Sequence, residues 1–349
     1  MKFWSNITKT LTPYVPGEQL NESGIIKLNT NENPFPPSPK VIEGIKKCLG
    51  PSLKKYPDPQ SSELRNNIAD FYDIEKKNIF IGNGSDEVLA HIFMAFFKDK
   101  KLYFPNITYS FYPVYCGLYE ITSKVIPLNE KFEIEKKQYL DLDGNIIFPN
   151  PNAPTGIGLE LEVIEEILIS NPDNLVVVDE AYIDFGGRTA VELIGKYKNL
   201  LIVQTFSKSR SLAGMRIGFA IGDTELIEGL IRVKDSFNSY PLDRLAQAAG
   251  KAGIEDKNYF DYTRKEIIKN REWLVSQLKI RGIEALPSMA NFIFVKLDNA
   301  ENTYKELKSR KILVRYFKNP LIDNYLRISI GTMKEMEILI KNIDEIMEV

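Results

Sequence analysis

A lysine with small, hydroxylated neighbours is the first feature of this chain whose residue types suggest chemistry. Lys208 comes soon after the aliphatic run at residues 200–203, which is short and therefore predicts a buried strand. The lysine thus follows a strand's exit, where its amine can form a Schiff base with an aldehyde such as that of pyridoxal phosphate. Ser207, Ser209 and Arg216 would supply hydrogen-bond donors for the phosphate. A basic, serine-rich surface loop is the alternative interpretation of these residues.

An acidic side chain at the end of another strand favours the first interpretation. Asp179 follows an apolar run at residues 175–178 that does not alternate, which predicts a central strand buried on both faces. A buried carboxylate needs a partner. Pyridoxal phosphate provides one, because its ring nitrogen must hold a proton for the ring to withdraw electrons. A third polar segment, the proline-rich turn at residues 148–156, also follows an apolar run.

The order of predicted elements indicates an α/β protein with two domains. Strands alternate with helices from about residue 79 to 222, which predicts a mainly parallel sheet with helices on both faces. Ligands of such sheets gather beyond the carboxyl ends of the strands, where Gly84, Asn152, Asp179 and Lys208 all fall. Long charged helices and short strands after about residue 230 predict a smaller α+β domain. The expected division is an N-terminal arm at residues 1–35 joining the small domain, a large cofactor-binding domain at 36–235 and the small domain at 236–349.

Three local expectations concern less regular stretches. We expect no clear element before about residue 25, a helix near residues 190–196, and one strand at residues 312–315.

The composition bounds the class of protein. Of 349 residues, 44% are hydrophobic and 26% are charged, which is ordinary for a globular chain with a large core. Lys plus Arg number 45 and Asp plus Glu 47, and this formal charge of −2 argues against nucleic-acid or general membrane-surface binding. Cys48 and Cys116 lie outside any CxxC motif, so neither disulfides nor a metal site are expected. Without a membrane-length apolar span or a signal-peptide core, the expected location is the cytoplasm.

The single histidine is expected to be structural. His91 lies among apolar residues at helical spacing, and no second histidine exists to complete a metal cluster. The chemistry must therefore use another base, and a lysine released from its Schiff base can serve.

Together these segments resemble the fold-type I pyridoxal-phosphate aminotransferases nearly from end to end, and among them the class II histidinol-phosphate aminotransferase family. Five separated segments in matching order carry the finer resemblance: residues 11–18, 28–34, 56–59, 179–185 and 326–332. The resemblance implies a homodimeric transferase that uses pyridoxal 5'-phosphate. Its reaction would be reversible transamination between L-histidinol phosphate and 2-oxoglutarate, giving imidazole acetol phosphate and glutamate in histidine biosynthesis.

The resemblance also implies which residues hold the cofactor. Lys208 would carry it, Asp179 would face the ring nitrogen, and Tyr109 would stack on the ring. The remaining implied cofactor contacts are Gly84, Ser85, Asp86, Thr205, Ser207, Arg216 and, from the partner subunit, Tyr56. The strand, glycine turn and helix start at residues 79–87 have the geometry of a phosphate cradle, which an ordinary serine N-cap shares.

One position departs from the family's pattern. The family has Asn directly before Pro-Thr-Gly, where it contacts the cofactor's phenolic oxygen, but this chain has Ala153. Asn152 lies one residue earlier. We expect Asn152 or Tyr182 to make that contact, with Tyr182 tuning the phenolic oxygen.

Four residues are the implied substrate contacts: Tyr14, Asn31, Arg315 and Arg327. A guanidinium fork accepts either a carboxylate, as in glutamate, or a phosphate, as in histidinol phosphate. Arg327 is expected to grip the substrate, with Arg315 and Tyr14 on the phosphate side. Threonine-phosphate decarboxylase and aromatic amino-acid aminotransferase are the alternatives of the same fold, and a ligand-binding module without activity is the alternative of another class.

Overall fold

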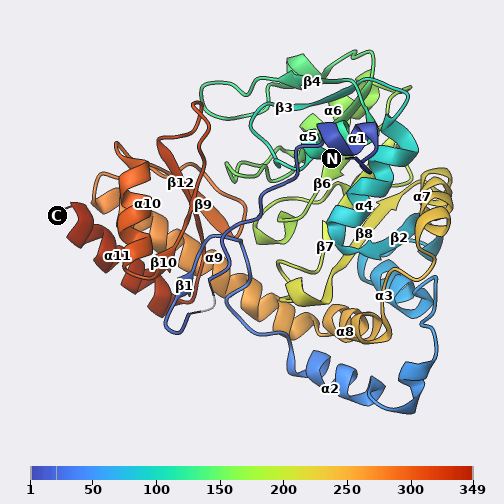
Figure 1. Cartoon of the computed structure of the whole chain (residues 1–349), viewed down its shortest axis with the longest axis horizontal. Helices are drawn as coiled ribbons and strands as arrows, with labels where there is room; N and C mark the ends of the chain where they lie inside the picture. The colour runs from blue at the N-terminus through green and yellow to red at the C-terminus, as the bar shows by residue number, and fades with distance from the viewer. Residues whose placement is uncertain (1, 21, 348–349) are drawn as a thin grey trace.

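The computed structural model describes residues 2–20 and 22–347, and a large sheet with helices on both sides forms its main body (Figure 1). The strands, in spatial order, are β2 (Ile79–Asn83), β8 (Ile217–Gly222), β7 (Leu200–Thr205), β6 (Val176–Asp179), β5 (Asn145–Pro149), β3 (Leu102–Pro105) and β4 (Ser123–Ile126). Strands β7 to β4 are parallel neighbours, whereas β8 runs antiparallel to both β2 and β7. The α/β fold with a mainly parallel sheet is confirmed.

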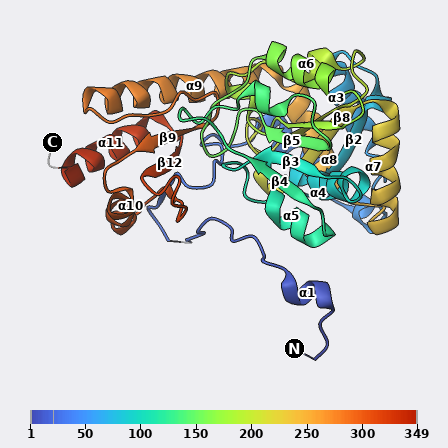
Figure 2. The same ribbon diagram turned by 90° about the horizontal axis from the view of Figure 1, so that it is seen from above.

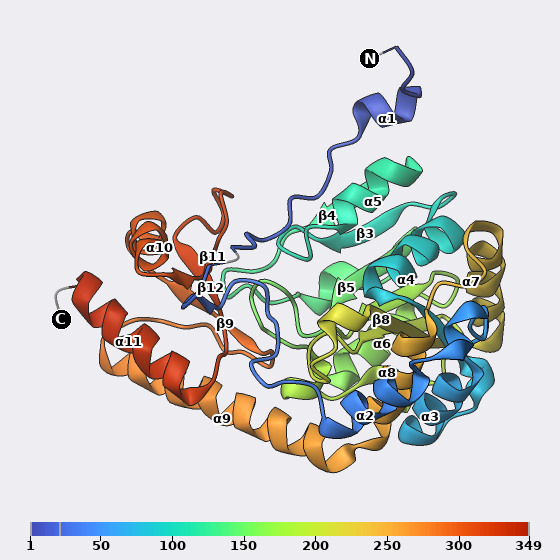
Figure 3. The same ribbon diagram turned by 60° about the horizontal axis from the view of Figure 1, so that its bottom comes forward.

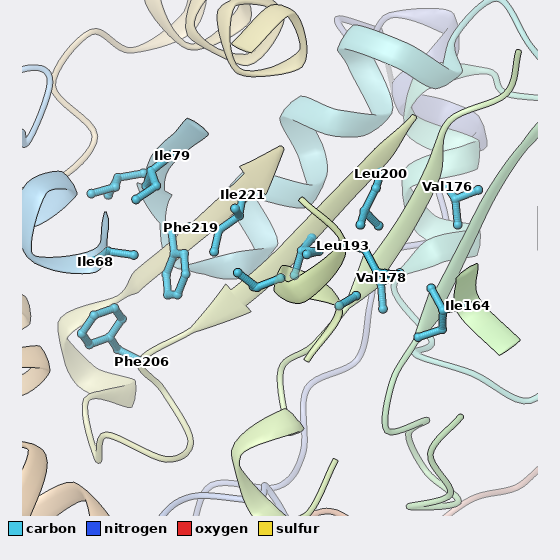
Figure 4. Packing of buried hydrophobic residues seen from close by; sticks show 14 of the residues in the cluster. Ile68, Ile79, Ile164, Val176, Val178, Leu193, Leu200, Phe206, Phe219 and Ile221 are labelled. Carbon is cyan, nitrogen blue, oxygen red and sulfur yellow. The ribbon is translucent and has the colours of Figure 1, made fainter. Parts of the chain in front are cut away.

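The central strands are buried on both faces, which is why their sequences do not alternate. In β6, Val176 and Val178 belong to the core on one face of the sheet and Val177 to the core on the other, as the two-residue repeat of a strand requires. Figure 4 shows side chains of the first of these cores, Val178 and Leu193 among them. Helices α3 (Ser62–Tyr72), α6 (Leu161–Ser170) and α8 (Arg244–Glu255) cover that face, and α4 (Gly84–Ile92), α5 (Tyr112–Tyr119) and α7 (Thr224–Phe237) cover the other.

A separate core belongs to a smaller group of elements that lies beside the large sheet (Figure 2). Its antiparallel sheet has the order β11 (Arg315–Tyr316), β12 (Tyr325–Ser329), β9 (Phe292–Lys296), and its helices are α9 (Lys257–Ile280), α10 (Ala300–Ser309) and α11 (Met333–Met347). Strand β1 (Ile26–Lys27) pairs in parallel with β10 (Ile312–Leu313), which joins the N-terminal segment to this part. The single strand expected at residues 312–315 is therefore two, because the chain changes partner at Val314 from β1 to β12.

The change from one core to the other falls later in the chain than expected. Helix α8 packs on α2 (Pro39–Cys48) and α3, and its Ala246 and Ala249 belong to the core of the large sheet. The small residues Gly44 and Ala252 allow α2 and α8 to approach closely. Helix α9 then passes from α8 to α11 (Figure 3). The transition thus lies within α9 and not near residue 235.

Two other local expectations were wrong. Residues Asn6–Thr10 form a short helix, α1, which Ser5 caps by accepting a hydrogen bond from the Thr8 N–H, and in Figure 2 it extends away from the body. The helix expected near residues 190–196 is only a 3₁₀ turn, Ala190–Leu193, because Ile194 is extended and Gly195 has a φ of +88°. None of the helices within residues 2–20 and 22–347 is long and apolar enough to cross a bilayer.

Candidate active site

The carboxyl ends of the parallel strands meet at one cavity of about 230 Å³. Pro149 ends β5, Asp179 ends β6 and Thr205 ends β7, and all three line it. Parallel strands bring their carboxyl ends to one edge of a sheet, so this convergence follows from the topology. Lys208, three residues beyond β7, lines the same cavity.

The cavity brings together most of the residues predicted from sequence. Those on its wall are Tyr14, Asn31, Ser85, Asp86, Tyr109, Asp179, Tyr182, Thr205, Ser207, Lys208, Arg216, Arg315 and Arg327. Gly84, Asn152, Tyr56 and Ser209 are not on the wall, and the Ser209 hydroxyl donates instead to the Asp184 carboxylate. Sequence reasoning assigned no role to Thr30, Thr108 and Phe317, which also line the cavity. Thr30 lies in the matched segment 28–34, whereas Thr108 and Phe317 lie in none of the five matched segments.

Lys208 and Asp179 have the surroundings that the predicted cofactor requires. The Lys208 Nζ donates to the Thr30 carbonyl at 3.2 Å and lies 5.7 Å from the centre of the Tyr182 ring. Asp179 is only 4% exposed, and burial raises its pKa to about 6, although hydrogen bonds from the Tyr112 hydroxyl (2.9 Å) and the Ala181 N–H (3.2 Å) act to lower it. A buried carboxylate on a cavity wall is suited to a cationic ring N–H. Nothing in the sequence distinguishes Tyr112 from the other tyrosines.

The start of α4 and the Arg216 side chain form a site suited to a phosphate. The Arg216 Nη2 lies 3.0 Å from the Asp86 Oδ2, and the Asp86 Oδ1 accepts a hydrogen bond from the Tyr109 hydroxyl at 2.8 Å. The first N–H groups of a helix have no partner within the helix and attract anions. Guanidinium, helix N-terminus and the cavity-lining Ser85 therefore converge where a phosphate would be held.

Two glycines outside the cavity wall allow Arg216 and strand β8 to lie close to the N-terminus of α4. Gly84 has a φ of +80°, and a Cβ there would lie 2.5 Å from the Arg216 Nη2. A Cβ at Gly218 would lie 2.2 Å from the Ser85 nitrogen. Any larger residue would push Arg216 or β8 away from the α4 N-terminus. Gly84 thus shapes the phosphate site without lining it.

Hydroxyl groups complete this side of the cavity. The Thr205 hydroxyl and the Ser207 Oγ are 2.9 Å apart, and both side chains lie on the wall. Arg216 lines the same cavity. The residues present therefore fit pyridoxal phosphate at the ring and at the phosphate.

The Asn152 side chain is not part of the cavity wall. Its Nδ2 donates to the Ile107 carbonyl at 3.0 Å and to the Thr155 hydroxyl at 3.1 Å, behind the wall. The next residue, Ala153, occupies the wall instead. Of the two residues expected at the phenolic oxygen, only Tyr182 lines the cavity, since the backbone of the proline-rich turn directs Asn152 elsewhere.

Two arginines lie directly opposite each other on neighbouring antiparallel strands. Arg315 of β11 is in register with Arg327 of β12, and both line the cavity. The Arg327 Nη2 donates to the Asn29 carbonyl at 2.9 Å, and burial together with the nearby Arg315 lowers the pKa of Arg327. Within residues 2–20 and 22–347, neither guanidinium lies within ion-pair distance of a carboxylate. Like charges opposite each other repel, so this pair favours an anionic ligand.

Tyr14 and Tyr56 differ in their relation to the cavity. The Tyr14 ring stacks on Phe111 with 4.6 Å between ring centres and lies on the wall. Tyr56 is 79% exposed, stacks on Tyr240 at 4.7 Å, and its carbonyl accepts a hydrogen bond from Arg244 at 3.0 Å. Within one chain Tyr56 contributes nothing to the cavity, so its predicted role requires a second subunit.

Similarity to known proteins agrees with this geometry. The model of the family described as aminotransferase class I and II matches residues 23–343. The chain is 54% identical to histidinol-phosphate aminotransferase 1 of Hydrogenovibrio crunogenus, over 99% of this chain and 98% of that protein. It is also 54% identical to the histidinol-phosphate aminotransferase of Clostridium acetobutylicum, over 99% of each.

A solved structure supports the fold. The crystal structure of histidinol-phosphate aminotransferase from Sinorhizobium meliloti in complex with pyridoxal-5'-phosphate has a TM-score of 0.89, covering 100% of this chain and 98% of that one. At 22% identity this likeness concerns the fold alone, and it confirms the fold-type I architecture. Because the family model matches residues 23–343, which is most of this chain, the chain belongs to the aminotransferase class I and II family.

Proposed function

We propose that this enzyme uses pyridoxal 5'-phosphate to transfer an amino group reversibly between L-histidinol phosphate and 2-oxoglutarate, as a homodimer in the cytoplasm. The observation that carries the proposal is the content of one cavity. Lys208, the buried Asp179 and the facing Arg315 and Arg327, which form no ion pair within the described part of the chain, line it together. The 54% identity to proteins named histidinol-phosphate aminotransferase supports this choice of substrate.

The cavity residues divide the work of holding the cofactor. Bound pyridoxal phosphate supplies an aldehyde carbon for amines and an electron-poor ring that stabilises negative charge on the substrate carbon. Asp179 would accept a hydrogen bond from the protonated ring nitrogen, and its burial would make this ion pair strong. Arg216 and the N-terminus of α4 would bind the phosphate, and the cavity-lining Tyr109 would pack against the cofactor ring.

Lys208 serves as the base of the reaction. A substrate amine would take the place of the Lys208 amine, and the Nζ would then be free to accept the proton of the amine-bearing carbon. Lys208 would give that proton up again in the course of the amino transfer, and the second substrate would reverse the path. The Thr30 carbonyl, 3.2 Å from the Nζ, holds the amine at the cavity wall.

The arginine pair accounts for two kinds of substrate. Glutamate carries an α-carboxylate, whereas histidinol phosphate carries a phosphate and no α-carboxylate. A guanidinium forms paired hydrogen bonds with either anion. In this proposal Arg327 binds the carboxylate of the amino donor, and Arg315 with Tyr14 binds the phosphate.

A single-turnover experiment separates the proposal from the alternatives of the same fold. The holoenzyme is mixed with histidinol phosphate, phenylalanine or threonine phosphate, and the loss of the cofactor's visible band and any released carbon dioxide are measured. We expect the fastest loss with histidinol phosphate and no carbon dioxide. Faster reaction with phenylalanine, or carbon dioxide from threonine phosphate, would overturn the proposed substrate.

A matched pair of variants tests the phosphate site. Arg315→Gln should raise the KM for histidinol phosphate at least about tenfold, the effect of losing a hydrogen bond to a charged group, with a smaller change for glutamate. Arg310→Gln, just after the end of α10, where the arginine pairs with Glu345 at the surface, is the control. Equal effects on both substrates would contradict the division of roles.

The homodimer is tested through Tyr56. Sedimentation should show a dimer for the holoenzyme, and Tyr56→Phe should weaken cofactor binding while leaving the dimer intact, because only the hydroxyl is lost. A fully active monomer would exclude a role for Tyr56 of the partner subunit.

A further inference from the structure

A buried chain of hydrogen bonds connects β12 to the cavity through the N-terminal segment. The Ser329 hydroxyl donates to the Asn31 Oδ1 at 2.9 Å, and the Asn31 N–H donates back to the Ser329 Oγ at 2.9 Å. The Asn31 Nδ2 then donates to the Tyr182 hydroxyl oxygen at 3.0 Å. Ser329 is 2% exposed and Asn31 is 1% exposed, so the hydrogen bonds between them are shielded from water.

The direction of each hydrogen bond follows from the chemistry of the groups. An amide nitrogen can only donate, so the Tyr182 oxygen accepts from Asn31 and its own proton is left for another acceptor. Turning the amide over would place the Nδ2 at Ser329 and remove the acceptor for the buried serine proton. Ser329 therefore fixes the orientation of the Asn31 amide, and this orientation makes the Tyr182 oxygen an acceptor from Asn31, so that the Tyr182 hydroxyl proton is free for another acceptor.

The backbone of Asn31 is also held in place. Its φ of +55° lies in the left-handed region, which Asn tolerates better than most residues. The Asn291 Nδ2 donates to the Asn31 carbonyl at 3.0 Å, which fixes this conformation from the start of β9. The amide thus cannot easily move away from Tyr182.

We propose that Ser329 and Asn31 are positioning residues that make the Tyr182 hydroxyl a hydrogen-bond donor into the cavity, toward the phenolic oxygen of the bound cofactor. The inference rests on the proposed function and on the contact between Tyr182 and that oxygen that the family resemblance implies. It matters in this chain because Ala153, with no polar side chain, occupies the neighbouring part of the wall. Tyr182 then makes the contact by itself, and Ser329, acting through the Asn31 amide, determines that the Tyr182 hydroxyl is the donor in it.

The visible absorbance of the bound cofactor reports this hydrogen bond independently of activity. A donor to the phenolic oxygen stabilises its negative charge and so lowers the pH at which the neighbouring imine nitrogen loses its proton. Ser329→Ala should raise the apparent pKa of the absorbance change by about one unit, the shift expected from one hydrogen bond to a charged group. The charged groups that share the cavity with Tyr182, chiefly Lys208, Arg327 and Asp179, are unchanged in this variant.

Three further variants make the test specific. Ser329→Thr keeps the hydroxyl and should restore the wild-type pKa. Asn31→Asp presents an acceptor to Tyr182 and should raise the pKa at least as much as Tyr182→Phe. Thr303→Val removes another buried hydroxyl, which donates to the Asn299 carbonyl at the N-terminal end of α10, and should leave the pKa unchanged.

A double variant decides between a relay and a general loss of structure. In a Tyr182→Phe background, Ser329→Ala should add no further shift, since the relay ends at the missing hydroxyl. An added shift, or a wild-type pKa for both Ser329→Ala and Asn31→Asp, would overturn the inference. If the wild-type protein showed no visible band with pyridoxal phosphate, the proposed function itself would fail, which is a distinguishable result.

Discussion

Replacing Asp179 by asparagine should stabilise the protein without cofactor and weaken the protein with it. Burial raises the pKa of Asp179 from 3.8 to about 6. At pH values between these two, Asp179 in the folded apoprotein keeps a proton that the same side chain in the unfolded protein has released. Stability contributed by this group is therefore present below about pH 4 and is lost as pH rises through about 6. The shift of about two units corresponds to ~3 kcal/mol lost by the apoprotein above pH 7.

The amide introduced by Asp179→Asn carries no charge and avoids this loss. It keeps one oxygen for the hydrogen bonds from Tyr112 and Ala181, and failure to satisfy both of them costs about 1 kcal/mol. The net expectation is an apoprotein about 1–2 kcal/mol more stable than wild type at pH 8, with no such gain at pH 4. Burial raises the pKa of Glu180 to about 7, so Glu180 also makes the stability depend on pH. This contribution is the same in both proteins and cancels when their stabilities are subtracted.

With cofactor bound the sign reverses, because the carboxylate then pairs with the ring N–H. Asp179→Asn should bind pyridoxal phosphate at least about tenfold more weakly. Urea unfolding of both proteins at pH 4 and pH 8, with and without cofactor, measures all four stabilities. A variant apoprotein that is less stable than wild type by the same amount at both pH values would refute the reasoning, since the carboxylate would then be an ordinary structural group.

Three more predictions follow from single contacts. Gly84→Ala places a Cβ against Arg216 and should weaken cofactor binding at least about tenfold in equilibrium titration; wild-type affinity would contradict the cradle. Tyr112→Phe removes a donor from Asp179 and should raise its pKa further, seen as weaker cofactor binding at pH 6 than at pH 8 relative to wild type. Burial lowers the pKa of His91 to about 4, so stability falls as pH drops from 6.5 toward 4 by up to ~3 kcal/mol; His91→Leu should remove this dependence in urea unfolding, and an unchanged dependence would exclude it.

Residues at strand ends were the part of the site that the sequence could predict. Apolar runs identify central strands, and the parallel topology brings their carboxyl ends together, so the residue pattern alone places Asp179 and Lys208 at one edge of the sheet. The arginine pair was assigned through the family resemblance. Its facing register, which gives the pair its physical meaning, is a property of the sheet.

The remaining site residues depend on contacts between distant segments. Tyr112 meets Asp179 from a helix 67 positions earlier, and Ser329 meets Asn31 across 298 positions. No local spacing encodes such pairs. The sequence left Asn152 and Tyr182 as alternatives, because the direction of a side chain in a proline-rich turn follows from its backbone and not from its position in the motif.

Boundaries between elements were also decided by packing. The run at residues 312–315 has the apolar content of one strand, but two different neighbours divide it into β10 and β11. Helix α8 was assigned to the small domain on composition, yet its small residues fit α2 and α3.

The central claim is that the amine of Lys208 carries the cofactor. Borohydride reduction of the holoenzyme converts an imine between lysine and cofactor into a stable amine, so the modified residue can be found by peptide mass analysis. We expect the added mass on the peptide that contains Lys208, and no labelled peptide in Lys208→Ala. Attachment at another lysine, or substantial transamination by the folded Lys208→Ala protein, would contradict the assignment.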